Sequence, residues 1–303
     1  MTKSLVTGGA GFIGSNLVDK LIDAGHEVVI IDNESAECNE KFYWNYDADC
    51  YKLDICDYEN TRKLYDGVDY VFHLAAESRL QPAILNPINA VTKNAVGTCT
   101  VLQCSREAGV KKVLYSSTSS AYGLNKFPNY ETDPNDCLNP YSVSKVAGEE
   151  LCKLYTNLYG LKTVIFRYFN VYGDGSPTTG QYAPVIGIFF KQKEQNIPLT
   201  VVGDGLQRRD FVHVDDVANA NIISAISEPI SGKYGEIYNI GSGKNISILE
   251  IAQAISNEYV HIPEREGEAR TTLACIDKFK QDFDWLPKLN VKKFIEGKIN
   301  GDI

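Results

Sequence analysis

Two tyrosine and lysine pairs have a spacing that could move a proton. Tyr-x-x-x-Lys occurs at Tyr122 to Lys126, where a glycine and a proline follow closely, and at Tyr141 to Lys145. Only the second pair lies in a stretch of helical spacing, which begins at a proline and ends at Gly160, so both side chains are expected on one helix face. An ammonium ~4 Å from a phenol, at an effective dielectric of ~20, lowers the phenol's pKa by ~3 units. We therefore predict Tyr141, supported by Lys145, as a general base that takes a proton from an alcohol.

A run of hydroxyl side chains precedes this pair. The sequence Ser-Ser-Thr-Ser-Ser-Ala-Tyr-Gly occupies residues 116–123, directly after an apolar, strand-like segment. Open parallel sheets bind ligands at the carboxyl ends of their strands, so hydroxyls here could relay a proton between a substrate and Tyr141. Taken one at a time, Ser116, Ser119 and Ser120 also fit an ordinary polar turn. Ser119 is kept as a candidate substrate contact.

Three glycines predict where the phosphates of a dinucleotide bind. Gly8, Gly11 and Gly14 follow the first apolar strand, and a helical pattern begins within them. Such glycines let the backbone approach a pyrophosphate, whose charge is met by N–H groups at the helix start. Asp32 ends the second strand, where a carboxylate accepts hydrogen bonds from an adenosine ribose and repels a 2′-phosphate. The pattern predicts NAD in preference to NADP.

A second glycine-rich segment, at residues 241–245, matches only part of a P-loop. Tyr238 occupies its upstream glycine position, and Asn245 replaces the hydroxyl residue that would bind magnesium. We therefore do not expect this segment to bind phosphate.

The pattern of apolar residues indicates which elements hold these groups. Apolar and β-branched runs at residues 5–7, 28–31, 68–74, 112–116 and 163–169 alternate with longer segments of helical spacing. Helices are expected from residue 13 to a stop at Gly25, over 88–108 and over 141–159, and Ser247 with Glu250 predicts a capping box for a later helix. This alternation is typical of an α/β fold whose parallel sheet is covered on both faces. The turn-rich loop at residues 172–180 is expected to be flexible and to carry ligand contacts.

Charge and composition exclude several classes of protein. The chain has 303 residues, 44% hydrophobic and 23% charged, and its net charge of −9 argues against general binding to nucleic acid or to anionic membranes. No apolar run approaches the ~18 residues of a membrane helix and no signal-peptide pattern opens the chain, which predicts no membrane association and a cytoplasmic location. The eight cysteines form no C-x-x-C pair. Free, buried thiols are expected, and no metal site.

From residue 4 to about residue 298, the sequence resembles the extended short-chain dehydrogenase/reductases, and within them the NAD-dependent nucleotide-sugar 4-epimerases. The shared motifs are Thr-Gly-Gly-Ala-Gly-Phe-Ile-Gly at 7–14, Leu-Asp-Ile at 53–55, His-Leu-Ala-Ala at 73–76, Pro-Tyr-x-x-x-Lys at 140–145, Arg-Tyr-Phe-Asn at 167–170 and Arg-Asp-Phe at 209–211. The resemblance implies a Rossmann-type, doubly wound parallel sheet over residues 1–170. It also implies a smaller nucleotide-sugar-binding portion over 171–303, of which about 211–245 return to the first domain.

The resemblance also implies individual site residues. Thr118, four residues before a Tyr-Gly pair, falls where relatives place a proton-shuttling Ser or Thr, and two arginines would anchor the substrate's pyrophosphate. The implied cofactor contacts are Gly8, Gly11, Phe12, Ile13, Gly14, Asp32, Asn33, Asp54, Ile55, Leu74, Ala75, Ala76, Asn94, Tyr141, Lys145 and Tyr168. The implied substrate contacts are Thr118, Ser119, Tyr141, Asn170, Arg209, Arg265, Glu268 and Thr272.

Departures from related branches narrow the expected reaction. The 4,6-dehydratases follow the shuttle threonine with Asp-Glu, and the uronate decarboxylases carry a glutamate two places after it, whereas this chain has Ser119 and Ser120. Without an acid there, elimination is disfavoured, and oxidation followed by re-reduction of one carbon remains. Uronate 4-epimerases tend to carry an arginine where this chain has Asp174. Thr272 is small where relatives restricted to plain hexoses carry a tyrosine.

The resemblance therefore implies inversion of C4 of a UDP-hexose through a 4-keto intermediate, with NAD as cofactor. UDP-GlcNAc and UDP-GalNAc are the expected substrates, with UDP-glucose and UDP-galactose as further candidates. The alternatives are a dehydratase or decarboxylase of the same family, a UDP-glucuronate 4-epimerase, an NADP-type reductase, which Asp32 disfavours, and a non-enzymatic NAD-binding sensor. The family also implies a homodimer, packed through residues 88–108 and 141–159.

Overall fold

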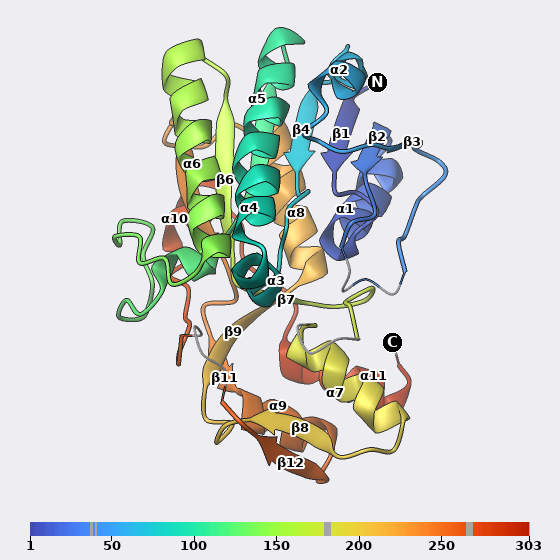
Figure 1. Ribbon diagram of the computed structural model, residues 1–303, viewed down its shortest axis with the longest axis vertical. Coiled ribbons are helices and arrows are strands. Elements are labelled where there is room, and N and C mark those ends of the chain that lie inside the picture. The colour runs from blue at the N-terminus through green and yellow to red at the C-terminus, as the bar shows by residue number, and fades with distance from the viewer. Residues whose placement is uncertain (37–38, 40, 179–182, 265–268, 303) are drawn as a thin grey trace.

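A seven-stranded sheet forms the larger part of the molecule. The computed structural model describes residues 1–36, 39, 41–178, 183–264 and 269–302 (Figure 1). The strands lie in the order β10-β6-β5-β4-β1-β2-β3, and every neighbouring pair is parallel. In chain order they are β1 Lys3–Thr7, β2 Glu27–Asp32, β3 Asp49–Lys52, β4 Tyr70–His73, β5 Lys112–Thr118, β6 Thr163–Tyr168 and β10 Glu236–Ile240. The predicted doubly wound, Rossmann-type parallel sheet is confirmed.

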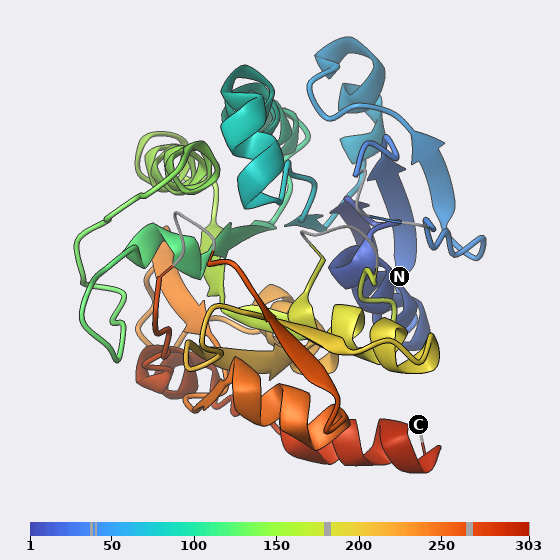
Figure 2. The ribbon, with the colours of Figure 1, turned by 60° about the horizontal axis from the view of Figure 1, so that its bottom comes forward.

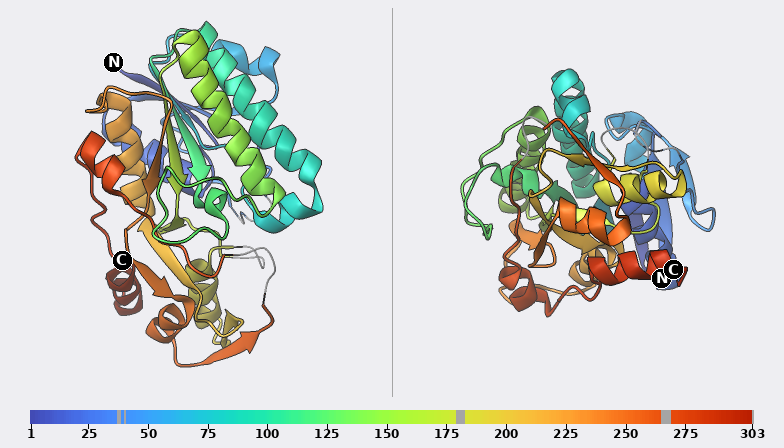
Figure 3. Two further views of the ribbon diagram at one scale, coloured as in Figure 1. Left: turned by 90° about the vertical axis from the view of Figure 1, so that its left-hand side faces the viewer. Right: turned by 90° about the horizontal axis from the view of Figure 1, so that it is seen from below.

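Helices cover both faces of this sheet, because both faces of its strands are apolar. One hydrophobic cluster packs the sheet against α1, α8 and α10, and a second packs it against α5 and α6 (Figure 3). The helices of this part are α1 Phe12–Asp23, α2 Tyr58–Thr61, α3 Leu80–Leu85, α4 Pro87–Val91, α5 Gly97–Glu107, α6 Pro140–Tyr159, α8 Val214–Ile226 and α10 Asp277–Phe283, with 3₁₀ turns at Arg62–Tyr65 and Ser119–Tyr122.

The ends of the predicted helices follow the expected capping chemistry. Before Pro140, the Asn139 side chain accepts a hydrogen bond from the N–H of Ser142, and Gly160 ends α6 in the left-handed conformation. Ser247 and Glu250 form both halves of a capping box at the start of α9 (Ile248–Ile255). These predicted boundaries are confirmed.

The helix expected over residues 88–108 is interrupted. A π-type turn, Thr92–Val96, separates α4 from α5. It contains Asn94, which is fully buried, and it is followed by Gly97, where an added Cβ would lie only 2.6 Å from the Ile55 side chain. The extra residue in the turn adjusts which side chains face the sheet, and a periodicity count over the whole segment does not detect it.

A smaller part lies beyond the carboxyl ends of the strands, where the arrowheads of β1, β2 and β4 point in Figure 1. It contains a three-stranded sheet in the order β11-β9-β7 and a parallel pair, β12-β8, both coming forward in Figure 2. Its elements are β7 Asn170–Tyr172, α7 Val185–Glu194, β8 Leu199–Val202, β9 Arg208–His213, β11 Asn245–Ser247, α9, β12 Tyr259–Ile262 and α11 Val291–Asn300. The chain crosses back between β9 and β11, where α8 and β10 join the first part. None of the described helices has the length and apolar character needed to cross a membrane.

Candidate functional site

A cavity of about 1230 Å³ lies between the two parts, at the carboxyl ends of the parallel strands. Nearly all of the site residues expected from the sequence line it. They are Gly8, Gly11, Phe12, Ile13, Gly14, Asp32, Asn33, Asp54, Ile55, Leu74, Ala75, Ala76, Thr118, Ser119, Tyr141, Lys145, Tyr168, Asn170, Arg209 and Thr272. Arg265 and Glu268 fall outside the described residues, so their roles stay predictions.

Two of the three glycines at the start of α1 are required by close backbone contacts. Gly8 has a φ of +72°, and a Cβ on it would lie 2.7 Å from the backbone nitrogen of Ala75. A Cβ on Gly14 would lie 2.1 Å from the carbonyl oxygen of Gly8. Gly11 is different, because its Cβ would meet nothing closer than 3.4 Å, so its lack of a side chain leaves open space on the cavity wall. The loop therefore fits the phosphates of a dinucleotide at the N-terminus of a helix.

Asp32 lies beneath this loop and hydrogen bonds to the backbone. Its carboxylate accepts hydrogen bonds from the N–H of Ala10 at 3.1 Å and the N–H of Glu34 at 2.8 Å. Burial raises the pKa of the Asp32 carboxyl despite these bonds. The side chain thus fixes the glycine loop while lining the cavity where the ribose is expected.

Asp54 is the centre of a second polar group at the same end of the cavity. It forms an ion pair with Lys93 and accepts a hydrogen bond of 3.3 Å from the side chain of Asn33. Burial opposes ionisation of this carboxyl, but the Lys93 ammonium and the Cys56 N–H outweigh it and lower its pKa. The group can accept hydrogen bonds from an adenosine at this end.

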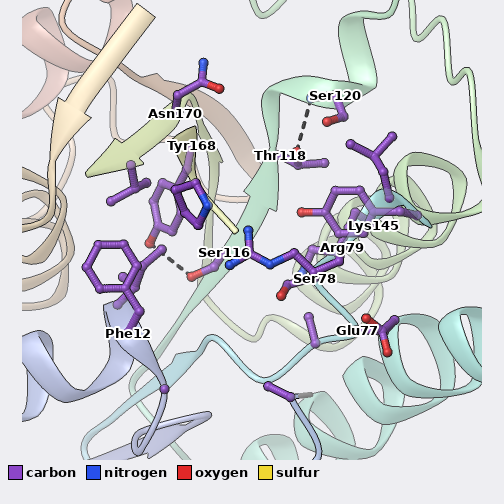
Figure 4. Close-up of a pocket in the computed structure, with 18 of the residues that line it drawn as sticks. Phe12, Glu77, Ser78, Arg79, Ser116, Thr118, Ser120, Lys145, Tyr168 and Asn170 are labelled. Atoms are coloured by element: carbon purple, nitrogen blue, oxygen red, sulfur yellow. Dashed lines mark hydrogen bonds between the residues drawn. The ribbon is translucent and has the colours of Figure 1, made fainter. Parts of the chain in front are cut away.

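Thr118, Tyr141 and Lys145 come together at the other end of the cavity. Thr118 ends β5, and its hydroxyl oxygen accepts a hydrogen bond of 3.1 Å from the N–H of Ser120. Tyr141 and Lys145 lie one turn apart near the start of α6, and all three residues line the cavity; Figure 4 shows Thr118 and Lys145. A hydrogen bond from Thr118 stabilises the charged form of the Tyr141 phenol. A relay through Thr118 therefore has a physical basis in the structure.

The expected lowering of the Tyr141 pKa is not found in the structure, and this prediction was wrong. Burial raises the pKa of Tyr141, and Thr118 and the charge of Arg79 offset this only in part. Burial also lowers the pKa of Lys145 to about 7. The Lys145 ammonium lies 4.4 Å from the centre of the Tyr115 ring rather than acting mainly on Tyr141. Spacing along a helix indicated proximity but could not show how burial shifts the pKa of either group.

Asn94 does not line the cavity but fixes the loop that does. Its side chain donates hydrogen bonds of 2.9 Å to the carbonyl of Glu77 and to the hydroxyl of Ser144, and it accepts one from the N–H of Glu77. Because Ser144 is in α6, Asn94 joins the loop after β4 to the helix that carries Tyr141. The structure thus gives Asn94 a bracing position.

A buried ion pair behind Thr118 was not anticipated from the sequence. Glu149, on α6, forms a bidentate pair with Arg167 of β6, at 2.8 and 2.6 Å, and accepts a hydrogen bond of 2.5 Å from the Ser117 hydroxyl. Both charged side chains are almost fully buried. The pair ties β6 to the helix that carries Tyr141, and the Ser117 hydrogen bond ties the strand that ends in Thr118 to the same helix. The sequence signal that could have indicated this pair is Glu149, which lies four residues after Lys145 on the predicted helix.

The loop after β4 also contributes cavity residues that the sequence reasoning missed. Glu77, Ser78 and Arg79 directly follow the His-Leu-Ala-Ala motif, and all three line the cavity (Figure 4). Opposite them, the Tyr168 hydroxyl accepts hydrogen bonds from Ser116 at 3.0 Å and from Asn221 at 2.7 Å. The His-Leu-Ala-Ala motif predicted where the loop after β4 begins. It did not predict that the next three residues also line the cavity.

The smaller part supplies the remaining wall. Asn170 donates hydrogen bonds to the carbonyl of Asp210, at 3.0 Å, and to the hydroxyl of Thr272, at 3.4 Å. The Arg209 guanidinium donates to the carbonyl oxygens of Arg208 and Arg270, at 3.1 and 3.2 Å. Arg209 and Thr272, far apart in the chain, thus line one end of the cavity.

The glycine-rich segment at residues 241–245 has a structural role, as its incomplete P-loop pattern indicated. The N–H groups of Ser242 and Gly243 donate to the Asp210 carboxylate at 2.7 and 3.0 Å, and Ala274 donates to it at 3.0 Å. These N–H groups therefore bind the carboxylate of Asp210, a side chain of the protein itself.

The seven described cysteines are free thiols, in agreement with the prediction, but most are not fully buried. Cys104 and Cys152 are buried, and the other five are half-buried. Cys38 falls outside the described residues. Within the described part of the chain, no group of three or more His, Cys, Asp and Glu side chains could hold a metal ion.

Comparison with known proteins relates this site to a family. A family model described as "NAD dependent epimerase/dehydratase family" matches residues 4–241. A Methanocaldococcus jannaschii protein provisionally named a UDP-glucose 4-epimerase is 37% identical over 305 residues, covering 98% of this chain and 97% of that protein. The UDP-N-acetyl-alpha-D-glucosaminuronate decarboxylase of Bacillus cytotoxicus is 37% identical over 276 residues, with 86% and 83% covered. The UDP-glucuronate 4-epimerase of Thermodesulfobacterium geofontis is 32% identical over 318 residues, with 98% and 94% covered.

Solved structures agree over almost the whole chain. A Thermotoga maritima UDP-glucose 4-epimerase with UDP-glucose has a TM-score of 0.91 and 32% identity, covering 99% of this chain and 98% of that one. A UDP-N-acetylglucosamine 4-epimerase of Methanobrevibacter ruminantium, in complex with UDP-N-acetylmuramic acid, has a TM-score of 0.89 and 32% identity, with 97% and 95% covered. A Thermus thermophilus UDP-glucose 4-epimerase with NAD has a TM-score of 0.88 and 29% identity, with 99% and 98% covered.

Proposed function

Because the chain belongs to the NAD-dependent epimerase/dehydratase family, we propose that it inverts C4 of a UDP-hexose through a 4-keto intermediate. The observation that carries this proposal is that Thr118 and Tyr141 line one cavity, with no acid at residues 119 and 120. A base and a hydroxyl relay suffice for removal and return of one alcohol proton. An elimination would also need an acid for the leaving group.

The chain's own residues would hold and move the proton at O4. NAD⁺, when bound, supplies an acceptor for the hydride of C4 and a donor for its return. Tyr141 takes the O4 proton, directly or through the Thr118 hydroxyl, and gives it back on the opposite face of C4. Lys145, when protonated, would stabilise the phenolate together with the positive charge that bound NAD⁺ supplies, against the burial that raises the pKa of Tyr141.

The substrate's diphosphate would be held away from the reacting carbon. Arg209 lines the cavity on β9, and its guanidinium suits a pyrophosphate. Arg265 and Glu268 are proposed to bind the diphosphate and ribose as the family pattern implies. Because the nucleotide stays firmly bound, the hexose can rotate in the cavity. C4 is then reduced on the face opposite to the one from which the hydride left.

The proposed sugar carries an N-acetyl group at C2, as in UDP-GlcNAc and UDP-GalNAc. Thr272 lines the cavity, and its small side chain leaves space that a tyrosine would fill. The solved UDP-N-acetylglucosamine 4-epimerase with a similar fold supports this choice, and the UDP-glucose 4-epimerases support UDP-glucose and UDP-galactose as further substrates.

A dehydratase or decarboxylase is the second candidate, because relatives with these names are similar to the chain. The serines at positions 119 and 120 count against it. A non-enzymatic NAD sensor is disfavoured because Thr118, Tyr141 and Lys145 are all present in one cavity.

The test is incubation of the protein and NAD with UDP-GlcNAc, UDP-glucose or UDP-glucuronate, without reductant, followed by proton NMR. We expect the C4 epimer and no net NADH. Tyr141→Phe should lower the rate by ~10² to 10⁴, the usual contribution of a general base. Tyr159→Phe, on the same helix but exposed, should keep wild-type activity. Loss of water or of CO₂ from the sugar would overturn the proposal.

A further inference from the structure

The aromatic ring of Tyr115, on β5, lies beneath the ammonium group of Lys145. The Nζ atom of Lys145 is over the ring, 4.4 Å from the ring centre. Lys145 lines the cavity, whereas Tyr115 is fully buried and is not among the lining residues. The face of an aromatic ring carries negative charge density and attracts a cation within ~6 Å of its centre. Tyr115 is therefore placed to stabilise the charged form of Lys145 from behind, outside the cavity.

Three further contacts fix the position of this ring. The Tyr115 hydroxyl donates a hydrogen bond of 3.1 Å to the backbone carbonyl of Lys145. The imidazole of His73 packs against the ring, with the two ring centres 5.5 Å apart. Gly148 of α6 has no side chain where the ring approaches, and a Cβ there would overlap the Tyr115 hydroxyl oxygen. Glycine is unfavourable inside a helix, and here it allows the ring to lie directly against α6.

The other ionisable groups near Lys145, or on the cavity wall that it shares, lie on α6, β4 and the loop after β4. They are Glu149, Cys152, Tyr141, His73, Glu77 and Arg79. Glu149 favours the charged lysine, but its own charge is offset by the bidentate pair with Arg167. Burial lowers the pKa of His73 well below its ordinary value and raises the pKa of the Cys152 thiol, so both stay uncharged near neutral pH.

The inference rests on the proposed function, in which protonated Lys145 stabilises the Tyr141 phenolate. Burial lowers the pKa of Lys145 to about 7, so a small loss of stabilisation removes its charge near neutral pH. We propose that Tyr115 is a positioning residue for the reaction, whose ring holds the protonated Lys145 side chain in the place from which it acts on Tyr141. The activity then depends on the charge density of the Tyr115 ring and not only on its bulk.

The experiment changes the charge density of the ring while keeping its shape. Tyr115 is replaced by phenylalanine and by phenylalanines that carry one, two or three ring fluorines, which withdraw electron density from the ring face. Rates of C4 epimerisation of UDP-GlcNAc or UDP-glucose are measured across pH with saturating NAD. We expect Tyr115→Phe to stay within about threefold of the wild-type kcat, because it keeps an aromatic face.

The fluorinated variants should lose activity in steps and only at higher pH. The descending limb of the pH profile, where Lys145 gives up its proton, should move to lower pH by up to ~1 unit with three fluorines. This shift lowers kcat about tenfold above the limb and leaves it unchanged below the limb. The KM for the sugar should change by less than about twofold, because Tyr115 does not line the cavity.

A second measurement does not depend on turnover. The ¹³C NMR signal of the Lys145 ε-carbon, assigned with Lys145→Met and titrated in the protein without cofactor, reports the protonation of this side chain. We expect its midpoint to stay near the wild-type value in Tyr115→Phe and to fall with each added fluorine.

Tyr65 provides a matched control for the effect of fluorine on packing. It is 1% exposed, belongs to the same hydrophobic cluster as Tyr115 and is not among the residues that line the cavity. Trifluorophenylalanine at position 65 should leave kcat, the pH profile and the Lys145 signal unchanged.

The possible results separate this inference from the proposed function. If either kcat above the descending limb or the Lys145 midpoint stayed constant across the fluorine series, the role of Tyr115 would be overturned while C4 epimerisation would stand. A full loss already present in Tyr115→Phe would assign the effect to the hydroxyl group and also overturn it. Absence of a C4 epimer with the wild-type protein would overturn the proposed function itself, and the NMR titration would still test the contact between Tyr115 and Lys145.

Discussion

The spacing of Tyr141 and Lys145 predicted that both residues belong to the site, but it did not predict the pKa of either side chain. Their four-residue separation, behind a glycine loop, predicted that they share a cavity with Thr118, and all three residues line the cavity in the structure. The direction of their pKa changes was not predictable, because it depends on how completely each group is buried. Lys145 is 2% exposed, and burial disfavours its charged form.

The lysine therefore makes stability depend on pH in a way that can be measured. Its pKa falls from 10.5 to about 7 in the folded chain, so between these values the unfolded chain holds a proton that the folded chain lacks. Stability from this group must rise with pH through that window, by ~1.4 kcal/mol per pH unit at most. We predict that the cofactor-free Lys145→Met variant has its greatest stability relative to wild type at or below pH 7, and that the difference shrinks toward pH 10.

Urea unfolding of both proteins at pH 7, 8 and 9 checks this prediction. The slope with pH is informative, whereas the constant offset also contains the packing of methionine against Tyr115. A stability difference that does not change with pH would show that Lys145 keeps its proton when buried.

At the scale of elements, the helix start at α1 uses its glycines for two different reasons. A methyl group on Gly14 would overlap the Gly8 carbonyl, at 2.1 Å, whereas one on Gly11 meets nothing within 3.3 Å. We predict that Gly14→Ala lowers the free energy of unfolding by ~1–3 kcal/mol, the usual cost of overpacking. Gly11→Ala should leave stability almost unchanged but weaken NAD binding, because the methyl group would be added to the cavity wall at the proposed phosphate site.

Thermal unfolding and NAD titration of the two variants test this distinction. If Gly11→Ala bound NAD as tightly as the wild type, the loop would not be the phosphate site. If Gly14→Ala were as stable as the wild type, the backbone contact between the loop and α1 would be unimportant.

The elements that the sequence predicted well are those whose signals are local. Five strands were found from apolar runs, and α6 and α9 from their caps, because each of these signals acts within a few residues. The π-type turn between α4 and α5 was missed because a periodicity count does not detect one extra residue, and because the close approach of Gly97 to Ile55 joins residues far apart in sequence. β3 and the β12-β8 pair were missed for a similar reason, since short edge strands are defined by their partners.

At the scale of the whole molecule, exposed apolar side chains on α4 and α6 favour a homodimer. Val143, Leu154 and Leu158 recur on one face of α6 and are 52%, 48% and 62% exposed, and Ile88 of α4 is 79% exposed. Such a surface on two packed helices is typical of an interface between copies. We predict that the wild-type protein is a dimer at micromolar concentration by light scattering.

A double variant, Leu154→Glu with Leu158→Glu, should give monomers by the same measurement, because four buried charges would face each other in the dimer. Ile226→Glu, an exposed position on α8 at the other face of the sheet, should remain dimeric. A wild-type protein that is only monomeric at micromolar concentration would contradict the predicted association.

The central claim is that one C4 hydride leaves the sugar and returns to it from the other side. UDP-GlcNAc deuterated at C4, incubated with the protein and NAD in ordinary water, tests this claim by NMR and mass spectrometry of the product. We predict UDP-GalNAc that keeps its deuterium at C4, with no label lost to solvent and no NADH accumulated. Recovery of only unchanged substrate, or of an inverted product that has lost the deuterium, would contradict the account.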